Sequence, residues 1–353
     1  MIDIDDQEAI KKIDTSNMIN HLIGFTQQCR DAVDLGKGFE DPWGYKGLQK
    51  IVIAGMGGSA IGGDILRSYL GNSIGLPIYV NRDYTLPGFV DKDTLLFVVS
   101  YSGNTEETLS SFEQGRKMGA RIVTITSGGI IEDVAQSEDI PIIRIPKGLP
   151  PRASLGYLFF PLLIVLERLG LIDEQDDDIS ETITLLRELC NSYRIEADIS
   201  ANKAKDMAVN IYGKLPIIYG VHGYTDAVAL RWKGQFNENS KTFASCNMLP
   251  ELDHNEVVGW KALSHLTKDF FVIFLRSKDD IDRLKMRINI TKSLISEDVS
   301  DVSEIWSEGN SRLAKIFSLI CLGDFTSYYL AILNNIDPTP VKVIDRLKKE
   351  LAQ

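Results

Sequence analysis

Several patterns that mark redox, metal or membrane proteins are missing from this sequence. Its four cysteines lie far apart and form no CxxC pair, which predicts reduced, partly buried thiols of a cytoplasmic protein at Cys29, Cys190, Cys246 and Cys321. Histidine is scarce, and without an HExxH motif or a close Cys/His cluster no metal site is predicted. No uninterrupted apolar run reaches the roughly 18 residues of a membrane helix, and the acidic, polar start is unlike a signal peptide.

An excess of positive charge is also absent. The 353 residues include 38 basic and 49 acidic side chains, which gives a net charge of −11. A nucleic-acid-binding protein needs a basic surface to neutralise phosphates, so the charge argues against that class. Hydrophobic residues make up 44% and charged residues 25% of the chain, the ordinary mixture of a folded globular protein. Any anionic ligand must therefore be bound by local donors rather than attracted by the overall charge.

What the sequence does contain is an alternation of apolar strands and helices. A helix is predicted over 6–34, followed by strands at 51–56, 77–80, 94–100, 121–126 and 140–146 with helices between them. A buried helix is predicted over 151–171, and two helices are predicted within 180–212. The scheme then recurs, with strands at 215–221 and 270–277 and helices at 224–241, 279–295, 311–335 and 341–353. This alternation predicts an α/β fold with parallel sheets covered by helices on both faces.

The repeated scheme predicts two α/β halves in tandem, which suits the length of the chain. We expect an N-terminal domain over 1–175 that includes the first helix. A helical connection is expected over 176–212, and it begins within a charged break at 173–178. A C-terminal domain with the closing helices is expected over 213–353.

A glycine-rich segment, GMGGSAIGGD (55–64), directly follows the first predicted strand. Glycines let the backbone approach a ligand closely, and the next helix offers free N–H groups. Gly57, Gly58 and Ser59 are therefore candidate ligand contacts. The segment also fits a loose dinucleotide fingerprint, for which Asp83 would supply the acidic residue. A tight strand-to-helix turn that binds nothing is the structural alternative.

A second candidate segment, SYSGNTEET (100–108), lies between another strand and helix. Ser100, Ser102 and Thr105 place three hydroxyls within six residues at a helix start. Hydroxyls and free backbone amides together can bind a phosphate without a lysine. Helix capping by Asn104 or Thr105 is the alternative, but it explains only one or two of these residues.

Five segments together resemble a known family. GMGGSAIGGD, SYSGNTEET, PPRASLG (150–156), GQFNENSK (234–241) and LDHNEVVGW (252–260) occur in the order seen in bifunctional phosphoglucose/phosphomannose isomerases, of the sugar isomerase (SIS) domain superfamily. The resemblance extends from about residue 45 to the end. It implies two tandem SIS domains, each a flavodoxin-like, five-stranded parallel sheet between helices. It also implies a tight homodimer with an active site between the domains and near the subunit interface. Asp253 departs from the pattern, because asparagine is expected before HNE.

The resemblance implies an aldose–ketose isomerase, an intramolecular oxidoreductase of the cytoplasm. It would interconvert glucose 6-phosphate and mannose 6-phosphate with fructose 6-phosphate through a cis-enediolate. Such a reaction needs a base that moves a proton between C2 and C1 and a positive charge beside the enediolate. It needs no metal and no redox cofactor.

Individual roles follow from the resemblance. Glu238 matches the catalytic base, with Glu251 and Glu256 as competing carboxylates. His254 matches the group that opens the sugar ring, and it would reach the active site of the neighbouring subunit. His21 and His265 are expected to be structural, and His222 is a weaker alternative.

Three further residues complete the predicted site. Arg152 follows two prolines and would stabilise the enediolate, because arginine stays charged and offers fixed donors. Lys348 on the last helix would assist ring opening, with Lys342 as the alternative. Thr339, in DPTP, would face C2 of the sugar and make room for either epimer.

Other functions stay open at this point. A SIS-type sugar-phosphate sensor without catalysis would not need Glu238, His254 and Arg152 together. A nicotinamide oxidoreductase built on GMGGSA would leave the serine cluster unexplained. An isomerase of heptose or amino-sugar phosphates is a narrower alternative.

Overall fold

The computed structural model describes residues 2–42, 47–71 and 73–351, and the chain forms two compact units. Unit N comprises Gly24–Ile183 and Ser311–Ala314. Unit C comprises Met1–Ile23, Thr184–Asn310 and Lys315–Gln353. The domain boundaries at 175 and 212 stay a prediction.

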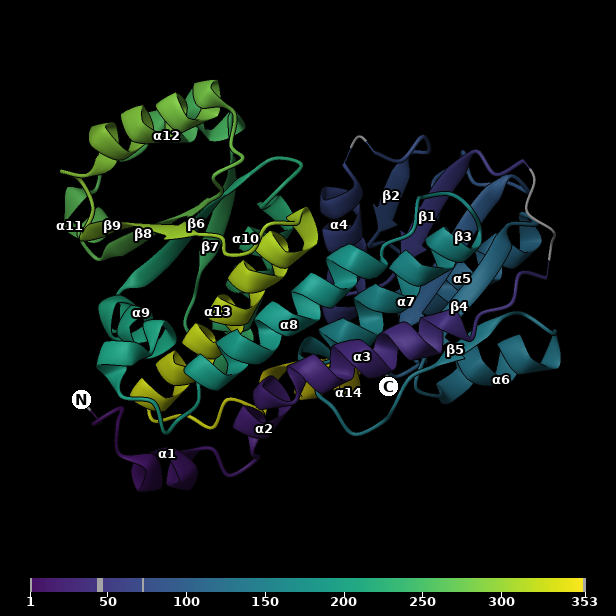
Figure 1. Cartoon of the computed structure of the whole chain (residues 1–353), viewed down its shortest axis with the longest axis horizontal. Helices are drawn as coiled ribbons and strands as arrows, with labels where there is room; N and C mark the ends of the chain where they lie inside the picture. Colours follow the sequence, from purple (N-terminus) through teal and green to yellow (C-terminus); the bar gives the residue numbers. More distant parts are fainter. Residues whose placement is uncertain (1, 43–46, 72, 352–353) are drawn as a thin grey trace. The chain divides into compact units, whose positions relative to one another are not determined.

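Unit N is built on a parallel five-stranded sheet (Figure 1). Its order is β2-β1-β3-β4-β5, and Ile51 of β1 is in register with Ile78 of β2 and Leu95 of β3. All five predicted strands are confirmed, as β1 (Lys50–Ala54), β2 (Ile78–Asn81), β3 (Thr94–Ser100), β4 (Arg121–Thr126) and β5 (Ile142–Arg144).

Helices cover both faces of this sheet. On one face, Phe112 of α5 (Glu106–Lys117) and Ile131 of α6 (Gly129–Ser137) share a buried core with alternate strand residues such as Val52 and Leu96. On the other face, α4 (Gly58–Leu70) packs closely, because a Cβ at Gly63 would lie 3.0 Å from the Ile53 side chain. The short 3₁₀ turn Pro151–Ala153, α7 (Leu155–Arg168) and α3 (Phe25–Lys37) complete this layer.

Unit C carries a parallel sheet of four strands in the order β7-β6-β8-β9. Strands β6 (Leu215–Val221) and β8 (Phe270–Arg276) are the two that the sequence predicts. Strands β7 (Ser245–Leu249) and β9 (Asp301–Trp306) went unpredicted, because most of their residues are half-buried and polar residues alternate irregularly with apolar ones. The expectation of five strands in this half is wrong for the described residues.

In unit C, a helix that lies on this sheet packs against a second helix. Helix α10 (Asp226–Gln235) lies against β6 and β7, and Trp232 of α10 donates a 2.9 Å hydrogen bond to the Leu319 carbonyl of α13 (Arg312–Leu333). Gly323 makes this approach possible, since a Cβ there would lie 2.1 Å from the Trp232 Nε1. The remaining helical elements are α1 (Gln7–Ile13), α2 (Met18–Ile23), η2 (Ile199–Ala201), α9 (Lys203–Ile211), η3 (Phe236–Ser240), η4 (Glu251–His254), η5 (Glu256–Val258), α11 (Ser264–Thr267), α12 (Asp282–Ile295) and α14 (Lys342–Leu351).

Two long helices, α8 (Asp176–Ser192) and α13, contribute residues to both units. By length and composition alone, α13 is long and apolar enough to cross a membrane, although the sequence has no uninterrupted apolar run of that length. Its most apolar window of 18 residues is entirely buried, as in the core helix of a globular protein.

The single helix predicted over 6–34 is wrong, because three helices occupy this segment. The Asp14 carboxylate accepts the N–H groups of Met18 at 2.8 Å and Ile19 at 3.0 Å, so it caps a new helix instead of continuing the first. Asn17 adopts a left-handed conformation with φ +62°, which ends the preceding turn. Gly24 separates α2 from α3.

Candidate active site

The order of the sheet in unit N defines where a ligand can bind. The connection after β1 runs to β2 on one side, whereas the connection after β3 runs to β4 on the other side, so the direction reverses between the neighbouring strands β1 and β3. In open α/β sheets, ligands bind outside the carboxyl ends of the strands at such a reversal. The glycine-rich segment follows β1 and the serine-rich segment follows β3, so both candidate segments lie at this edge.

The glycine-rich segment forms an open turn into α4. Gly57 has φ +50°, a conformation that favours glycine, and a Cβ there would meet no atom within 4 Å. Gly57 is also the N-cap residue of α4, and it has no side chain with which to cap the first turn. Ser59 is buried, and its Oγ accepts the N–H of Tyr101 at 3.2 Å. The turn therefore exposes backbone at Gly57 while Ser59 joins it to the serine-rich segment.

The serine-rich segment bonds to itself and leaves the N-cap position of α5 without a side-chain cap. Buried Ser100 places its Oγ 3.1 Å from the Oγ1 of Thr105 and accepts the N–H of Gly103 at 3.1 Å. Exposed Ser102 accepts the N–H of Asn104 at 3.3 Å. Thr105 occupies the N-cap position of α5, yet its side chain makes no capping hydrogen bond.

Asn104 does not cap α5 in place of Thr105. Its Oδ1 accepts the N–H of Ile130 at 3.0 Å, in the first turn of α6. The capping alternative is therefore not the arrangement that the structure adopts. The first N–H groups of a helix without a side-chain cap are a suitable site for an anion.

Arg152 lies beside the glycine-rich segment. Its side chain is 5% exposed, and a Cβ at Gly58 would lie 2.8 Å from the Pro151 carbonyl oxygen. Tyr101 fixes the approach to this turn, because its hydroxyl accepts the N–H of Leu149 at 2.8 Å and donates to the Pro146 carbonyl at 2.9 Å. No pattern in the sequence indicated this role of Tyr101. The structure thus brings three separate motifs of unit N together.

In unit C, Glu238 and Thr339 are held near each other by Lys241. Glu238 is half-buried in a π-helical turn, Phe236–Ser240, that extends α10. Such turns are rare and occur frequently at functional sites. The Lys241 ammonium donates to the Glu238 carbonyl at 2.6 Å and to the Pro338 carbonyl at 3.0 Å. Thr339 follows Pro338 directly, so the proposed base and the residue expected to face C2 belong to one hydrogen-bonded cluster.

His254 ends a short 3₁₀ turn after β7, and its side chain is exposed. Its neighbour Asp253 accepts hydrogen bonds from Arg287 at 3.2 Å and Thr291 at 2.7 Å, both on α12. The unexpected aspartate therefore anchors the turn that presents His254.

The two competing carboxylates have local partners. Glu256 accepts hydrogen bonds from Tyr219 and from Asn247. Burial and, second to it, the Glu256 charge raise the pKa of the Tyr219 hydroxyl. Glu251 is exposed and accepts a 3.1 Å hydrogen bond from Asn255. These contacts are those of structural groups.

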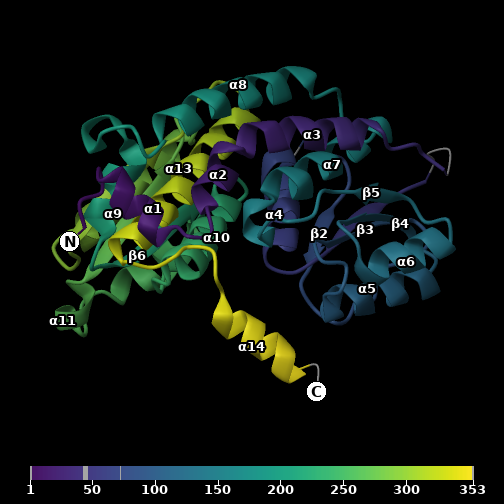
Figure 2. The ribbon, with the colours of Figure 1, turned by 90° about the horizontal axis from the view of Figure 1, so that it is seen from below.

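The structure does not place the remaining candidate lysines, histidines and Asp83 beside the motifs described above. Lys342 and Lys348 are on α14, all of whose described residues are exposed, and Figure 2 shows this helix standing clear of α13 and the sheet of its own unit. Burial lowers the pKa of His21, with Asp14 opposing the shift. His222 is exposed, 3.8 Å from the Asp226 carboxylate. Asp83 accepts the N–H of Tyr84 at 2.6 Å, a local turn contact.

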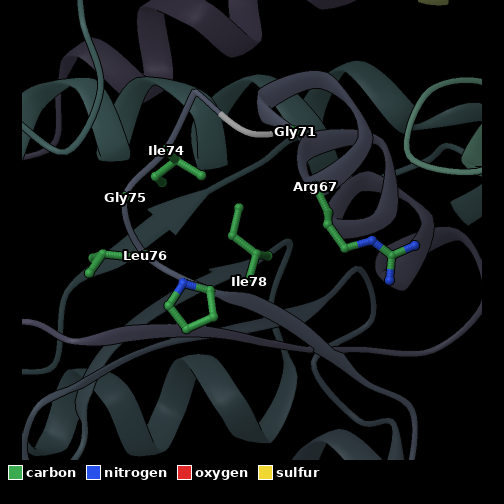
Figure 3. A pocket seen from close by; sticks show the side chains of 7 residues that line it. Arg67, Gly71, Ile74, Gly75, Leu76 and Ile78 are labelled. Atoms are coloured by element: carbon green, nitrogen blue, oxygen red, sulfur yellow. The ribbon is translucent and has the colours of Figure 1, made fainter.

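A hollow of about 310 Å³ in unit N does not coincide with these motifs (Figure 3). Its lining runs from the end of α4 to the start of β2 and includes Arg67, Ile74, Leu76 and Ile78. The start of β2 is at the amino-terminal edge of the parallel sheet, whereas the glycine- and serine-rich segments lie at the carboxyl-terminal edge. No group of three or more His, Cys, Asp or Glu side chains that could hold a metal occurs within 2–42, 47–71 and 73–351.

Comparison with known proteins decides the family. A SIS domain model matches residues 47–142, and a model of the bacterial phospho-glucose isomerase C-terminal SIS domain matches residues 200–351. A bifunctional phosphoglucose/phosphomannose isomerase of Caldicellulosiruptor bescii is 46% identical to this chain, and the match covers 95% of this chain and 99% of that protein. The chain belongs to the bifunctional phosphoglucose/phosphomannose isomerase family.

A second relative agrees in sequence, and a solved structure agrees in fold. The bifunctional phosphoglucose/phosphomannose isomerase of Aquifex aeolicus is 42% identical over 88% of this chain and 91% of that protein. The crystal structure of a glucose-6-phosphate isomerase like protein from Thermus thermophilus shares the fold, with a TM-score of 0.66, 18% identity, and coverage of 96% of this chain and 98% of that one. Two α/β domains of the SIS type are thereby confirmed.

Proposed function

We propose that this protein interconverts glucose 6-phosphate and mannose 6-phosphate with fructose 6-phosphate through a cis-enediolate. Membership of the bifunctional isomerase family carries the proposal. The geometry of unit N supports it, because a helix start without a side-chain cap, clustered hydroxyls and a buried arginine suit a sugar phosphate.

Phosphate binding is assigned to the segments of unit N. The hydroxyls of Ser59, Ser100, Ser102 and Thr105 and the backbone at Gly57 and Gly58 would replace the water around the phosphate. Charge-assisted hydrogen bonds of this kind are the strong ones in proteins. They also explain how a chain of net charge −11 binds an anion without a basic surface.

The chemical steps are assigned to five side chains. Glu238 moves the proton between C2 and C1, and Arg152 stabilises the negative charge of the enediolate. His254 opens the ring with help from Lys348. Thr339 faces C2, where its small side chain leaves room for both epimers. Neither a metal nor a redox cofactor is needed for this proton transfer.

Subunit organisation and location are part of the same proposal. The exposed side chain of His254 suits a residue that serves the neighbouring subunit of a homodimer. We place the enzyme in the cytoplasm, where its four cysteines, which form no disulfide, stay reduced. The domain boundaries at 175 and 212 likewise remain our assignment.

A coupled assay with both hexose 6-phosphates tests the reaction. Fructose 6-phosphate should form from each substrate in the presence of a chelator. E238Q should lower kcat by roughly 100- to 10,000-fold, whereas the matched variant E251Q should keep it. Binding of both sugar phosphates without turnover in the unaltered protein would identify a sensor instead.

The separate roles of Glu238 in proton transfer and His254 in ring opening can be tested directly. H254N should impair closed-ring substrates far more than open-chain ones, because its task ends when the ring opens. Mixing inactive E238Q and H254N subunits should restore some activity if His254 crosses the interface. Verified subunit exchange without recovery would contradict the shared site.

A further inference from the structure

Lys241 has a backbone conformation that is unusual for lysine. It follows the π-helical turn that carries Glu238, and its φ of +54° lies in the left-handed region. A side chain with a Cβ is disfavoured there, and glycine or asparagine is common at this position after a helix. Residues held in such conformations cluster at functional sites, where the surrounding structure enforces them.

The side chain of Lys241 joins two segments that are about 100 residues apart in the sequence. Its Nζ lies within hydrogen-bond distance of three carbonyl oxygens, those of Glu238 at 2.6 Å, Pro338 at 3.0 Å and Asn239 at 3.4 Å. Three acceptors match the three donors of an ammonium group. The π-helical turn and the Asp337–Pro340 segment are therefore tied through one charged group.

The Asp337–Pro340 segment is itself anchored at its other end. The Asp337 carboxylate accepts Thr15 Oγ1 at 2.6 Å, Ser16 Oγ at 2.8 Å and the Thr339 N–H at 3.0 Å. A second brace runs from Asn334 Nδ2 to the Ser240 carbonyl at 2.9 Å. These bonds form a continuous path from the 15–16 turn to the backbone of Glu238.

We propose that Lys241 is a positioning residue that sets the Glu238 carboxylate relative to Thr339, and thus relative to C2 of the sugar. The inference rests on the proposed function, because it assumes that Glu238 is the base. Reacting atoms must meet within a few tenths of an ångström of their contact distance, and a displacement near 1 Å costs roughly 100-fold in rate. Loss of the ammonium should therefore reduce turnover more than substrate binding.

Three variants distinguish the effect of the Lys241 ammonium group on turnover from the effect of the left-handed backbone at this position. K241M keeps an unbranched side chain one atom shorter than that of lysine and removes the donors, whereas K241G removes the side chain and relieves the left-handed backbone. K241R keeps a charged donor that can reach two carbonyls. K203M is the matched control, because Lys203 also belongs to unit C and makes a 2.7 Å ion pair with Glu308 on an exposed surface.

Each variant is assayed for kcat and KM with glucose 6-phosphate and mannose 6-phosphate. We expect kcat to fall roughly 10- to 100-fold in K241M and K241G, with KM within threefold of the unaltered value. K241R should recover most of kcat, and K203M should match the unaltered protein. Because Thr339 faces C2, the ratio of the two sugars' kcat values should change in K241M.

Three results overturn the proposal. Full kcat in K241G would show that only the turn geometry matters, and a loss confined to KM in K241M would show that Lys241 binds substrate. If the unaltered protein converts neither sugar, the proposed function fails. If E238Q is inactive while K241M keeps full kcat, only the positioning role fails.

Discussion

Replacement of Gly103 by alanine tests whether the serine-rich segment is built by close packing against its neighbour. Gly103 has φ +68°, and a Cβ there would lie 1.7 Å from the Gly128 carbonyl oxygen. Since Cβ contacts below 3.0 Å essentially never occur, the two segments must separate by about 1.3 Å, the difference between these distances. That shift would disturb the hydrogen bond from Thr126 Oγ1 to Gly128 O, now 2.8 Å, and that from Ile131 N to Gly103 O, now 3.1 Å.

The expected loss of stability combines two costs. A left-handed backbone with a Cβ costs about 1–2 kcal/mol, and forced overpacking adds about 1–3 kcal/mol. G103A should therefore lower the free energy of unfolding by about 2–5 kcal/mol. G119A is the matched control, because Gly119 has φ +73° but a Cβ there would meet only Lys92, at 4.0 Å. G119A should therefore lower the free energy of unfolding only by the cost of the left-handed backbone, about 1–2 kcal/mol.

Urea unfolding measures the free energy of unfolding of G103A and G119A. The KM for glucose 6-phosphate measures how far each substitution weakens substrate binding at the serine-rich segment. KM should rise at least tenfold in G103A, because Ser100 and Thr105 move with the segment, and by less than twofold in G119A. Equal destabilisation of the two variants, together with an unchanged KM in G103A, would refute the reasoning.

Three further predictions concern phosphate binding, acid stability and the core. The double variant S100A/T105A should raise KM for both hexose phosphates by roughly one to two decades per lost hydrogen bond, and an unchanged KM in steady-state kinetics would argue for a structural role. Burial acts to raise the pKa of Asp337, but the hydrogen bonds from Thr15, the Thr339 N–H and Ser16 outweigh it and lower the pKa below its usual 3.8. This stabilisation is present above the unfolded pKa and lost as pH falls through the folded value, so acid titration followed by circular dichroism should show a weaker decline below about pH 4 in D337N. Arg231 donates to buried Asp324 at 3.0 and 2.6 Å, and R231M should destabilise the protein by about 3–5 kcal/mol in urea unfolding, because it leaves a buried carboxylate without its cation. An R231M loss below about 1 kcal/mol would contradict that last estimate.

The strands of unit N and its two ligand segments could be predicted from the sequence, because both signals are local. Continuous apolar runs such as those of β1 and β3 are typical of a sheet covered on both faces. Clustered glycines and hydroxyls directly after such strands lie at the carboxyl edge whatever the packing around them. The motifs also sufficed to suggest the family, which the comparisons confirmed.

Irregular elements of unit C could not be predicted in this way. Strands β7 and β9 are only half-buried, so their residues carry no clear alternation. The break at Asp14 depends on a side chain that bonds forward to Met18 and Ile19, an interaction that competes with helix continuation and is not expressed in apolar spacing.

The sequence by itself therefore determined the α/β class, the family resemblance and the residue types of the site. Only the tertiary structure decided which of those residues meet. Gly58 lies against Pro151 because α4 and the turn of Arg152 pack backbone to backbone. Lys241 reaches Pro338 because the chain returns through α13 to the π-helical turn. Such contacts join residues nearly 100 positions apart, and their geometry depends on how whole helices and sheets pack, which no local pattern records.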